Sequence, residues 1–333
     1  MAPMLPTALA ADLAPVPQSL PMQNTANFLP APGPVRPGSL AAWAVALRPP
    51  SLLVAVSPVL VGAALAWQRE GHVDAKLVIL ILAAAVLIQV ITNLQNDVGY
   101  TVRRAERSNR SGMPRATANG WLGVTQVRAT IVAVIAVTLL LGLPLVLLRG
   151  MPVLLMGLAS IVAAVAYMGG PRPIAYTPMG ELIVFVFFGL VAVGGTEYVL
   201  TGSNTAATWL AACAIGGLAS AALALNNHRD IAHDADVGRR TFGVCFGVSA
   251  SQWMYNVALL APFALTAALA AALASPAPLL PLALLPMAWR LQREMVACRG
   301  GSAFTPLLVR TFKLELMFSV LLSLGFIGAR VLA

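Results

Sequence analysis

Two short segments of the sequence place an asparagine one helical turn before an aspartate. NLQND contains Asn93 and Asp97, and NNHRD contains Asn226 and Asp230. Asp234 follows Asp230 by four residues, so a continuing helix would present both carboxylates on one face. Carboxylate and amide oxygens are ligands that Mg²⁺ prefers, and bound Mg²⁺ commonly bridges to substrate phosphates. The matched spacing predicts an internal duplication and two metal-binding helix ends that face one cavity.

Arginines follow both segments closely, and guanidinium groups make bidentate contacts with phosphate oxygens. Together the two residue types predict a diphosphate held at a membrane surface, with a hydrophobic tail in an apolar cavity between helices. The alternative for either segment alone is a helix-terminal carboxylate in a salt bridge with a nearby arginine. A negative charge at a helix C-terminus opposes the helix dipole. Two such acids at matched positions therefore favour the metal site.

The elements that must position these residues are long apolar segments. Of the 333 residues, 59% are hydrophobic and 10% are charged, whereas a soluble domain carries roughly 25% charged residues. Repeated apolar runs of about 20 residues indicate a polytopic, all-α membrane protein. The expected spans are nine: 50–67, 76–96, 127–148, 151–168, 178–200, 207–226, 251–274, 277–289 and 314–332. The eighth is short and rich in proline.

The basic residues fall on alternate sides of this arrangement. The formal net charge is +9, which in a soluble protein would indicate a nucleic-acid partner. Here the positive-inside rule and anionic lipid headgroups explain it, and no nucleic-acid partner is expected. Seventeen of the 21 Lys and Arg lie in the N-terminal segment or in loops after the even-numbered spans. We therefore expect a cytoplasmic N-terminus and an active site that faces the cytoplasm.

The ends and the cysteines of the chain add little chemistry. Residues 1–40 are rich in proline and alanine and almost uncharged, so we expect a disordered cytoplasmic tail followed by one nine-helix domain over 41–333. The three cysteines have neither the spacing nor the companion ligands of a zinc site.

Over roughly residues 41–330 the sequence resembles the UbiA-type intramembrane prenyltransferases, and most closely their 1,4-dihydroxy-2-naphthoate polyprenyltransferase branch. The resemblance rests on ALRPPSLLVAVSPVLVGAALA, NLQNDVGY, RSGMPRATANGW, GPRPIAYTPMGELIVFVFFGLVAVGGTEY and NNHRDIAHDADVGRRTFGVCFG. It implies nine helices around a central cavity, with two Asp-rich motifs on the cytoplasmic side. It also implies Mg²⁺-dependent transfer of a polyprenyl group from its diphosphate to an aromatic acceptor, with loss of the carboxyl group as CO₂. The setting implied is a bacterial inner membrane and menaquinone biosynthesis.

The resemblance also implies roles for individual residues. Asp97, Asp230 and Asp234 are the expected catalytic carboxylates. The expected metal ligands are Asn93, Asn96, Asp97, Glu106, Asn226, Asp230 and Asp234. The expected diphosphate-binding residues are Arg110, Arg115, Arg229, Arg239 and Tyr100. Arg172 and Tyr176 are expected to orient the acceptor or the diphosphate, and Arg172 is otherwise one more cytoplasmic charge.

One position departs from the family pattern. The first motif usually reads Asn-Asp-x-x-Asp with a further acid downstream, but here Tyr100 replaces the second aspartate and Glu106 is the later acid. A neutral phenol is a poor Mg²⁺ ligand. The first metal site would then depend on Asn93 or Asn96, Asp97 and Glu106, and Tyr100 would donate a hydrogen bond to a phosphate oxygen.

Two alternatives stay open. The acceptor could be 4-hydroxybenzoate, homogentisate or a haem-like ring, because nothing in the residues themselves selects the naphthoate. A transporter also combines internal repeats with polar helix ends. Against transport, the acids gather at one face, and the spans 127–148, 151–168, 251–274 and 314–332 show no charge at mid-depth.

Overall fold

The computed structural model describes residues 35–107, 110–298 and 300–331. Most of the expected disordered tail, residues 1–34, lies outside the described residues. From Arg36 onward the chain forms one helical unit. All regular secondary structure in the described residues is helical, which confirms the expected all-α class.

Most helices follow one another through short connections, whereas residues 103–123 separate the helix that ends at Val102 from the one that begins at Val124. In chain order they are α1 (Leu40–Leu47), α2 (Pro49–Glu70), α3 (Ala75–Val102), α4 (Val124–Arg149), α5 (Met151–Met168), η1 (Ile174–Tyr176), α6 (Gly180–Val184), η2 (Phe185–Val191), α7 (Ala192–Thr201), α8 (Ala206–Arg229), α9 (Ile231–Asp236), α10 (Phe242–Ala272), η3 (Ala277–Leu284), α11 (Leu285–Ala297), η4 (Gly301–Ala303) and α12 (Phe304–Val331). Segment η2 is π-helical and joins α6 to α7 into one continuous rod.

Eight helices in the described part of the chain are long and apolar enough to cross a membrane. The expected span 277–289 is not one of them, because it is divided into the 3₁₀-helical η3 and the amphipathic α11. The count of nine spans therefore stays a prediction. The last span begins at Phe304 instead of 314. As a result Glu315 lies within α12 and is buried. The expectation that this span carries no charge at mid-depth stays a prediction.

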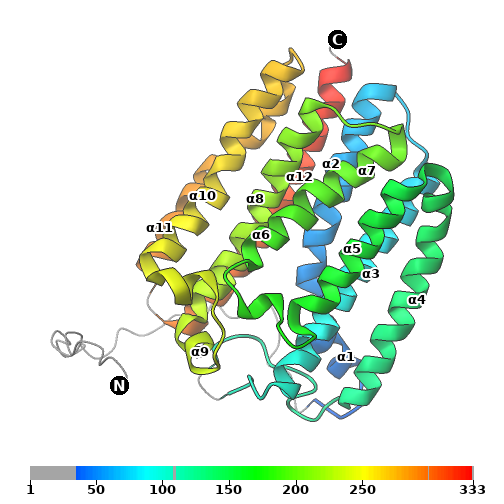
Figure 1. Cartoon of the computed structure of the whole chain (residues 1–333). Helices are drawn as coiled ribbons and strands as arrows, with labels where there is room; N and C mark the ends of the chain where they lie inside the picture. Colours follow the sequence, from blue (N-terminus) through cyan, green and yellow to red (C-terminus); the bar gives the residue numbers. More distant parts are fainter. Residues whose placement is uncertain (1–34, 108–109, 299, 332–333) are drawn as a thin grey trace, which may run out of the picture. The chain divides into compact units, whose positions relative to one another are not determined.

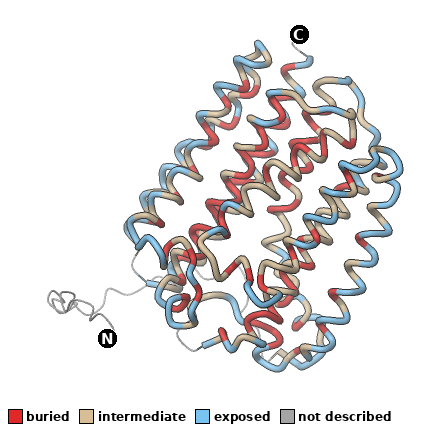
Figure 2. The backbone as a smooth tube through the Cα atoms, viewed as in Figure 1, coloured by how far each residue is buried: buried red, intermediate tan, exposed pale blue. Residues whose placement is uncertain are grey.

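Helix α8 lies at the centre of the helical unit, whereas α4 is exposed along most of its length (Figure 2). Small residues allow α8 to approach its neighbours closely. A Cβ atom on Gly189 of η2 would lie 2.9 Å from the Cα atom of Gly216 on α8, which is too close for two carbon atoms. Exposed Leu and Val side chains on α4 are what a lipid-facing helix requires.

Three connecting segments meet at the lower end of the view in Figure 1: the described residues of 103–123, residues 169–179, and residues 230–241, which include α9. His233 Nε2 lies 2.8 Å from the carbonyl oxygen of Ala105, and Arg239 Nε donates to the carbonyl oxygen of Ala175 at 3.1 Å. The C-terminal ends of α3 and α8 therefore lie at the same end of the helical unit, which the matched segments predicted.

Candidate active site

Tyr100, on the last turn of α3, lies at the centre of a group of arginines. The distances from its ring centroid to the guanidinium carbons of Arg115, Arg110 and Arg239 are 4.1, 4.9 and 5.6 Å. Such separations allow the negative ring face to attract the cations. Arg239 Nη1 also donates a hydrogen bond to the Tyr100 hydroxyl at 2.5 Å. Three of the expected diphosphate-binding arginines thus converge on the residue that departs from the family pattern.

A fourth guanidinium group, that of Arg48, adds to this charge from the turn between α1 and α2. Burial, followed by the positive charges of Arg115 and Arg110, lowers the pKa of Arg48 well below its usual value. Burial and the charge of Arg110 likewise lower the pKa of Arg115 to about 10. The Nε and Nη1 atoms of Arg115 are buried and have no partner in the described residues. Buried and mutually repelling cations of this kind favour binding of an anion.

Asp97 is fully buried, and its carboxylate accepts three hydrogen bonds. Its Oδ2 accepts from the Ala116 amide at 2.9 Å, and its Oδ1 accepts from the Thr117 amide and hydroxyl at 2.7 and 2.6 Å. These bonds attach the turn that follows Arg115 to the end of α3. Asp97 therefore fixes the backbone from which Arg115 reaches Tyr100, and both of its oxygens already have donors.

The other expected ligands of the first segment differ in their contacts. The Asn93 amide donates to the Leu47 carbonyl and the Ser51 hydroxyl at 2.8 and 2.9 Å, so it joins α3 to the α1–α2 turn. Glu106 forms an ion pair with Arg110 at 3.0 Å. The Oδ1 atom of Asn96 is buried without a partner in the described part of the chain.

In the second segment, Arg229 bridges the expected ligands Asn226 and Asp230. Its Nε and Nη2 atoms bind the two carboxylate oxygens of Asp230 at 2.8 and 2.6 Å, and Nη2 also donates to Asn226 Oδ1 at 2.9 Å. Burial acts to raise the pKa of Asp230, but the hydrogen bond and charge of Arg229 outweigh it and hold that pKa below its usual value. A cation is thus already bound at these oxygens.

Asp234, on α9, is fully buried and has one oxygen to spare. Its Oδ1 accepts from Arg239 Nη1 at 2.7 Å, whereas its Oδ2 has no partner in the described residues. A buried carboxylate oxygen without a donor is a natural cation ligand. Among the described residues, no group of three or more His, Cys, Asp or Glu side chains is placed to hold a metal. One Mg²⁺, however, needs only one or two carboxylates when phosphates and waters complete its shell, so the second segment fits one ion.

The two residues expected to orient the acceptor differ in position. The Tyr176 ring lies 5.1 Å from the guanidinium carbon of Arg103 and 6.0 Å from that of Arg239, so it borders the arginine group. Burial raises the pKa of its hydroxyl. Arg172 is exposed, and the structure does not bring it to the other site residues.

Sequence reasoning missed several residues that shape this site. Arg48 was counted only as a cytoplasmic charge, and Thr117 carried no recognisable signal. His233, whose ring contacts Ala105, joins the loop after α3 to α9. Asn227 of α8 was also missed: its amide donates to Glu181 Oε1 at 2.9 Å, and Glu181 keeps Oε2 unpartnered in the described residues. The position of Asn227 beside two expected ligands was the available signal.

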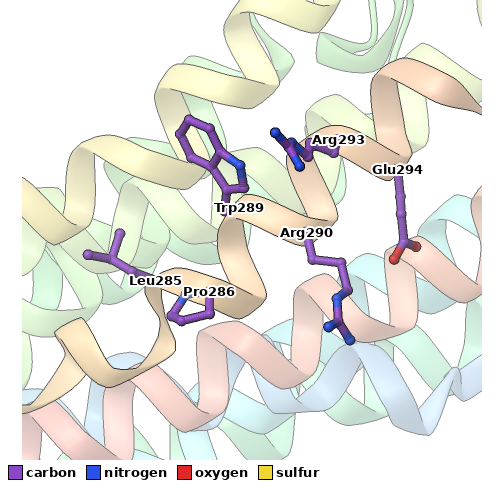
Figure 3. A pocket seen from close by; sticks show the side chains of 6 residues that line it. All are labelled: Leu285, Pro286, Trp289, Arg290, Arg293 and Glu294. Carbon is purple, nitrogen blue, oxygen red and sulfur yellow. The ribbon is translucent and has the colours of Figure 1, made fainter.

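A hollow of about 640 Å³ lies elsewhere, along α11 (Figure 3). Its lining residues are Leu285, Pro286, Trp289, Arg290, Arg293 and Glu294. None of them belongs to the group around Tyr100. An exposed tryptophan beside two arginines is typical of a helix at the membrane interface, so we assign this surface to the lipid boundary and not to the active site.

These features define a class: a helical integral membrane protein with a buried group of arginines where its spans end. The model of the UbiA prenyltransferase family matches residues 55–308, and the chain belongs to this family of prenyl-transferring enzymes.

Curated relatives are similar over most of the chain. The 1,4-dihydroxy-2-naphthoate octaprenyltransferase of Escherichia coli is 35% identical over 212 residues, which cover 62% of this chain and 68% of the relative. The enzyme of the same name from Haemophilus influenzae is 30% identical over 293 residues, which cover 85% and 94%.

Solved structures have the same fold. A UbiA homologue from Archaeoglobus fulgidus bound to DMAPP and Mg²⁺ aligns with a TM-score of 0.64 at 15% identity, over 88% of this chain and all of that one. An apo UbiA homologue from Aeropyrum pernix K1 aligns with a TM-score of 0.63 at 19% identity, over 84% and 97%.

Proposed function

We propose that this chain transfers a polyprenyl group from polyprenyl diphosphate to 1,4-dihydroxy-2-naphthoate, as the names of its curated relatives describe for those enzymes. The observation that carries the proposal is the buried arginine group around Tyr100, in which Arg110 and Arg115 keep unpartnered guanidinium nitrogens and Arg239 binds the Asp234 carboxylate. This arrangement suits a diphosphate at the end of membrane-spanning helices, with the prenyl tail among apolar side chains.

In the proposed reaction, the allylic C–O bond breaks, pyrophosphate leaves, and the electron-rich ring forms a new C–C bond. The ring carboxylate departs as CO₂. Negative charge grows on the leaving diphosphate, so Arg110, Arg115 and Arg239 stabilise the transition state more than the ground state. Mg²⁺, held by Asn226, Asp230 and Asp234, would neutralise further charge on the phosphate oxygens. A homologue of the same fold is described with Mg²⁺ and a prenyl diphosphate, which supports that choice of ion.

The proposal also includes the membrane and the side of it on which the N-terminus and the site lie. The basic loops gather at the end that carries the site, and positive loops stay on the cytoplasmic side. We therefore place the N-terminus and the site on the cytoplasmic side of a bacterial inner membrane.

The proposal is tested with membranes that contain the expressed chain, allylic diphosphates of several lengths and a panel of aromatic acceptors. The mass of the product identifies the acceptor and reveals whether CO₂ is lost. Prenylated and decarboxylated naphthoate is the expected product. Transfer to 4-hydroxybenzoate alone would move the chain to another branch of the family, and no product with any acceptor would contradict the proposal.

A further inference from the structure

We propose that Tyr100, Arg110, Arg115 and Arg239 form a metal-free phosphate subsite, so that this chain binds its diphosphate with one divalent metal ion, held by the second segment. This inference rests on the proposed function. It concerns which part of the diphosphate's negative charge is neutralised by arginine side chains and which part by a metal ion.

The first step of the argument is that every carboxylate oxygen of the first segment has a partner, whereas the second segment keeps one unpartnered carboxylate oxygen, Asp234 Oδ2. Both oxygens of Asp97 accept hydrogen bonds from the Ala116 and Thr117 turn. Glu106 is paired with Arg110. A metal at this segment would have to remove Asp97 from three short hydrogen bonds in a fully buried site, and the turn that carries Arg115 would lose its attachment.

The second step is that Tyr100 organises cations and does not bind one as a ligand. The Arg110, Arg115 and Arg239 guanidinium groups all lie within 6 Å of its ring centroid. Its hydroxyl accepts from Arg239, which fixes the guanidinium plane. The ring is therefore a neutral support that holds three cations together without neutralising them.

The third step is that several guanidinium nitrogens of this group lack hydrogen-bond acceptors. Arg115 is 4% exposed, yet its Nε and Nη1 atoms have no partner in the described residues, and the same is true of Arg110 Nε. Buried guanidinium N–H groups need acceptors, and phosphate oxygens match their planar geometry. The second segment has unpartnered acceptors instead, Asp234 Oδ2 and Asn227 Oδ1, and the first segment adds one neutral acceptor, Asn96 Oδ1. Of these atoms, Asp234 Oδ2 is the one that belongs to a carboxylate. One half of the site thus calls for an anion and the other half for a cation.

The test uses the full-length protein in lipid nanodiscs with geranyl S-thiolodiphosphate, an analogue whose bond to the leaving group is unreactive. Affinity is measured by calorimetry in EDTA and in Mg²⁺, and bound Mn²⁺ per chain is counted by electron paramagnetic resonance with the analogue present. We expect measurable binding in EDTA, tighter binding with metal, and one Mn²⁺ per chain.

Variants separate the two halves of the site. Arg115→Gln should weaken analogue binding at least tenfold in EDTA without changing the Mn²⁺ count. Asp234→Asn should abolish Mn²⁺ binding and leave the EDTA affinity within a few-fold of the parent. Arg104→Gln, which changes an exposed arginine of the same loop, is the matched control and should alter neither quantity. Thermal unfolding of each variant checks that it is folded.

Two results would overturn the inference while the proposed function stands: two Mn²⁺ per chain in the analogue complex, or analogue binding that requires metal. Absence of analogue binding under both conditions would overturn the proposed function and the inference together.

Discussion

The Tyr100 hydroxyl and the Asp234 carboxylate share one nitrogen of Arg239. Nη1 of this residue lies 2.5 Å from the phenol oxygen and 2.7 Å from Asp234 Oδ1. One guanidinium group thereby joins the end of α3 to α9, across 139 positions of the sequence in the case of Tyr100. The two polar segments, which are far apart in the chain, become one site through this contact.

Loss of Arg239 should therefore disrupt both halves of the site. We expect Arg239→Gln to reduce the rate of prenyl transfer on the order of 10²- to 10³-fold, the size seen when one preorganised charge donor is removed. Arg239→Lys should restore only part of it, because an ammonium group lacks the planar fork that reaches Tyr100, Asp234 and the Ala175 carbonyl together. The measurement is product formation in membranes at saturating acceptor. Arg240→Gln, at an exposed neighbour, is the control, and a loss of equal size there would contradict the argument.

Asp97 should act through the turn that it holds. In Asp97→Asn one amide N–H faces a backbone donor, so the variant should lose about 1–3 kcal/mol of stability together with most of its activity. The thermal midpoint and the transfer rate measure these effects, and the Mn²⁺ count should stay at that of the parent. A variant with unchanged stability that had lost one bound metal would show that Asp97 is a ligand instead.

Arg229 competes with metal for oxygens of Asn226 and Asp230. Arg229→Gln removes the bound cation, so we expect a several-fold higher affinity for Mn²⁺ and a lower affinity for the diphosphate analogue. Titration of Mn²⁺ by paramagnetic resonance, with and without analogue, separates the two effects. Weaker Mn²⁺ binding in the variant would show that Arg229 supports the metal site and does not compete with it.

Tyr100→Asp would introduce a carboxylate among three guanidinium groups. It would form salt bridges with Arg115 and Arg239 and withdraw them from the diphosphate, so we expect about a 10- to 100-fold loss of transfer. Tyr100→Phe keeps the ring and should lose much less. Michaelis constants for the prenyl diphosphate in both variants provide the measurement. Full activity of Tyr100→Asp, with a second Mn²⁺ bound, would instead show that an acidic metal site can be restored.

The sequence was sufficient for the parts of this site that depend on local spacing. Apolar runs predicted the spans, and the separation of Asn93 from Asp97 and of Asn226 from Asp230 predicted two helix ends at one side. These features follow from helix periodicity and from the cost of burying charge in lipid. The arginines that follow both segments closely in the sequence also predicted a group of arginines near these helix ends.

What could not be predicted depends on contacts between distant segments. Nothing in NLQND shows that the Asp97 carboxylate accepts from amides 19 and 20 residues later, because loop conformation is not encoded in helix periodicity. Arg48 was indistinguishable from other cytoplasmic charges until the turn before α2 placed it near Arg115. The start of α12 was missed because Arg310 and Lys313 interrupt its apolar pattern, although both still lie within the helix.

The backbones of η2 and α8 are in direct contact where they cross, at Gly189 and Gly216. The rod formed by α6, η2 and α7 begins just after the loop that contacts Arg239, and α8 ends at the residue that binds Asp230. Since the two backbones touch where they cross, a single added methyl group would tilt one rod against the other. Both helices extend from this crossing to the polar end of the protein, so a small tilt would change the distance between Ala175 and Asp230. The catalytic geometry is therefore set partly by two residues that have no side chains and lie inside the apolar part of the protein.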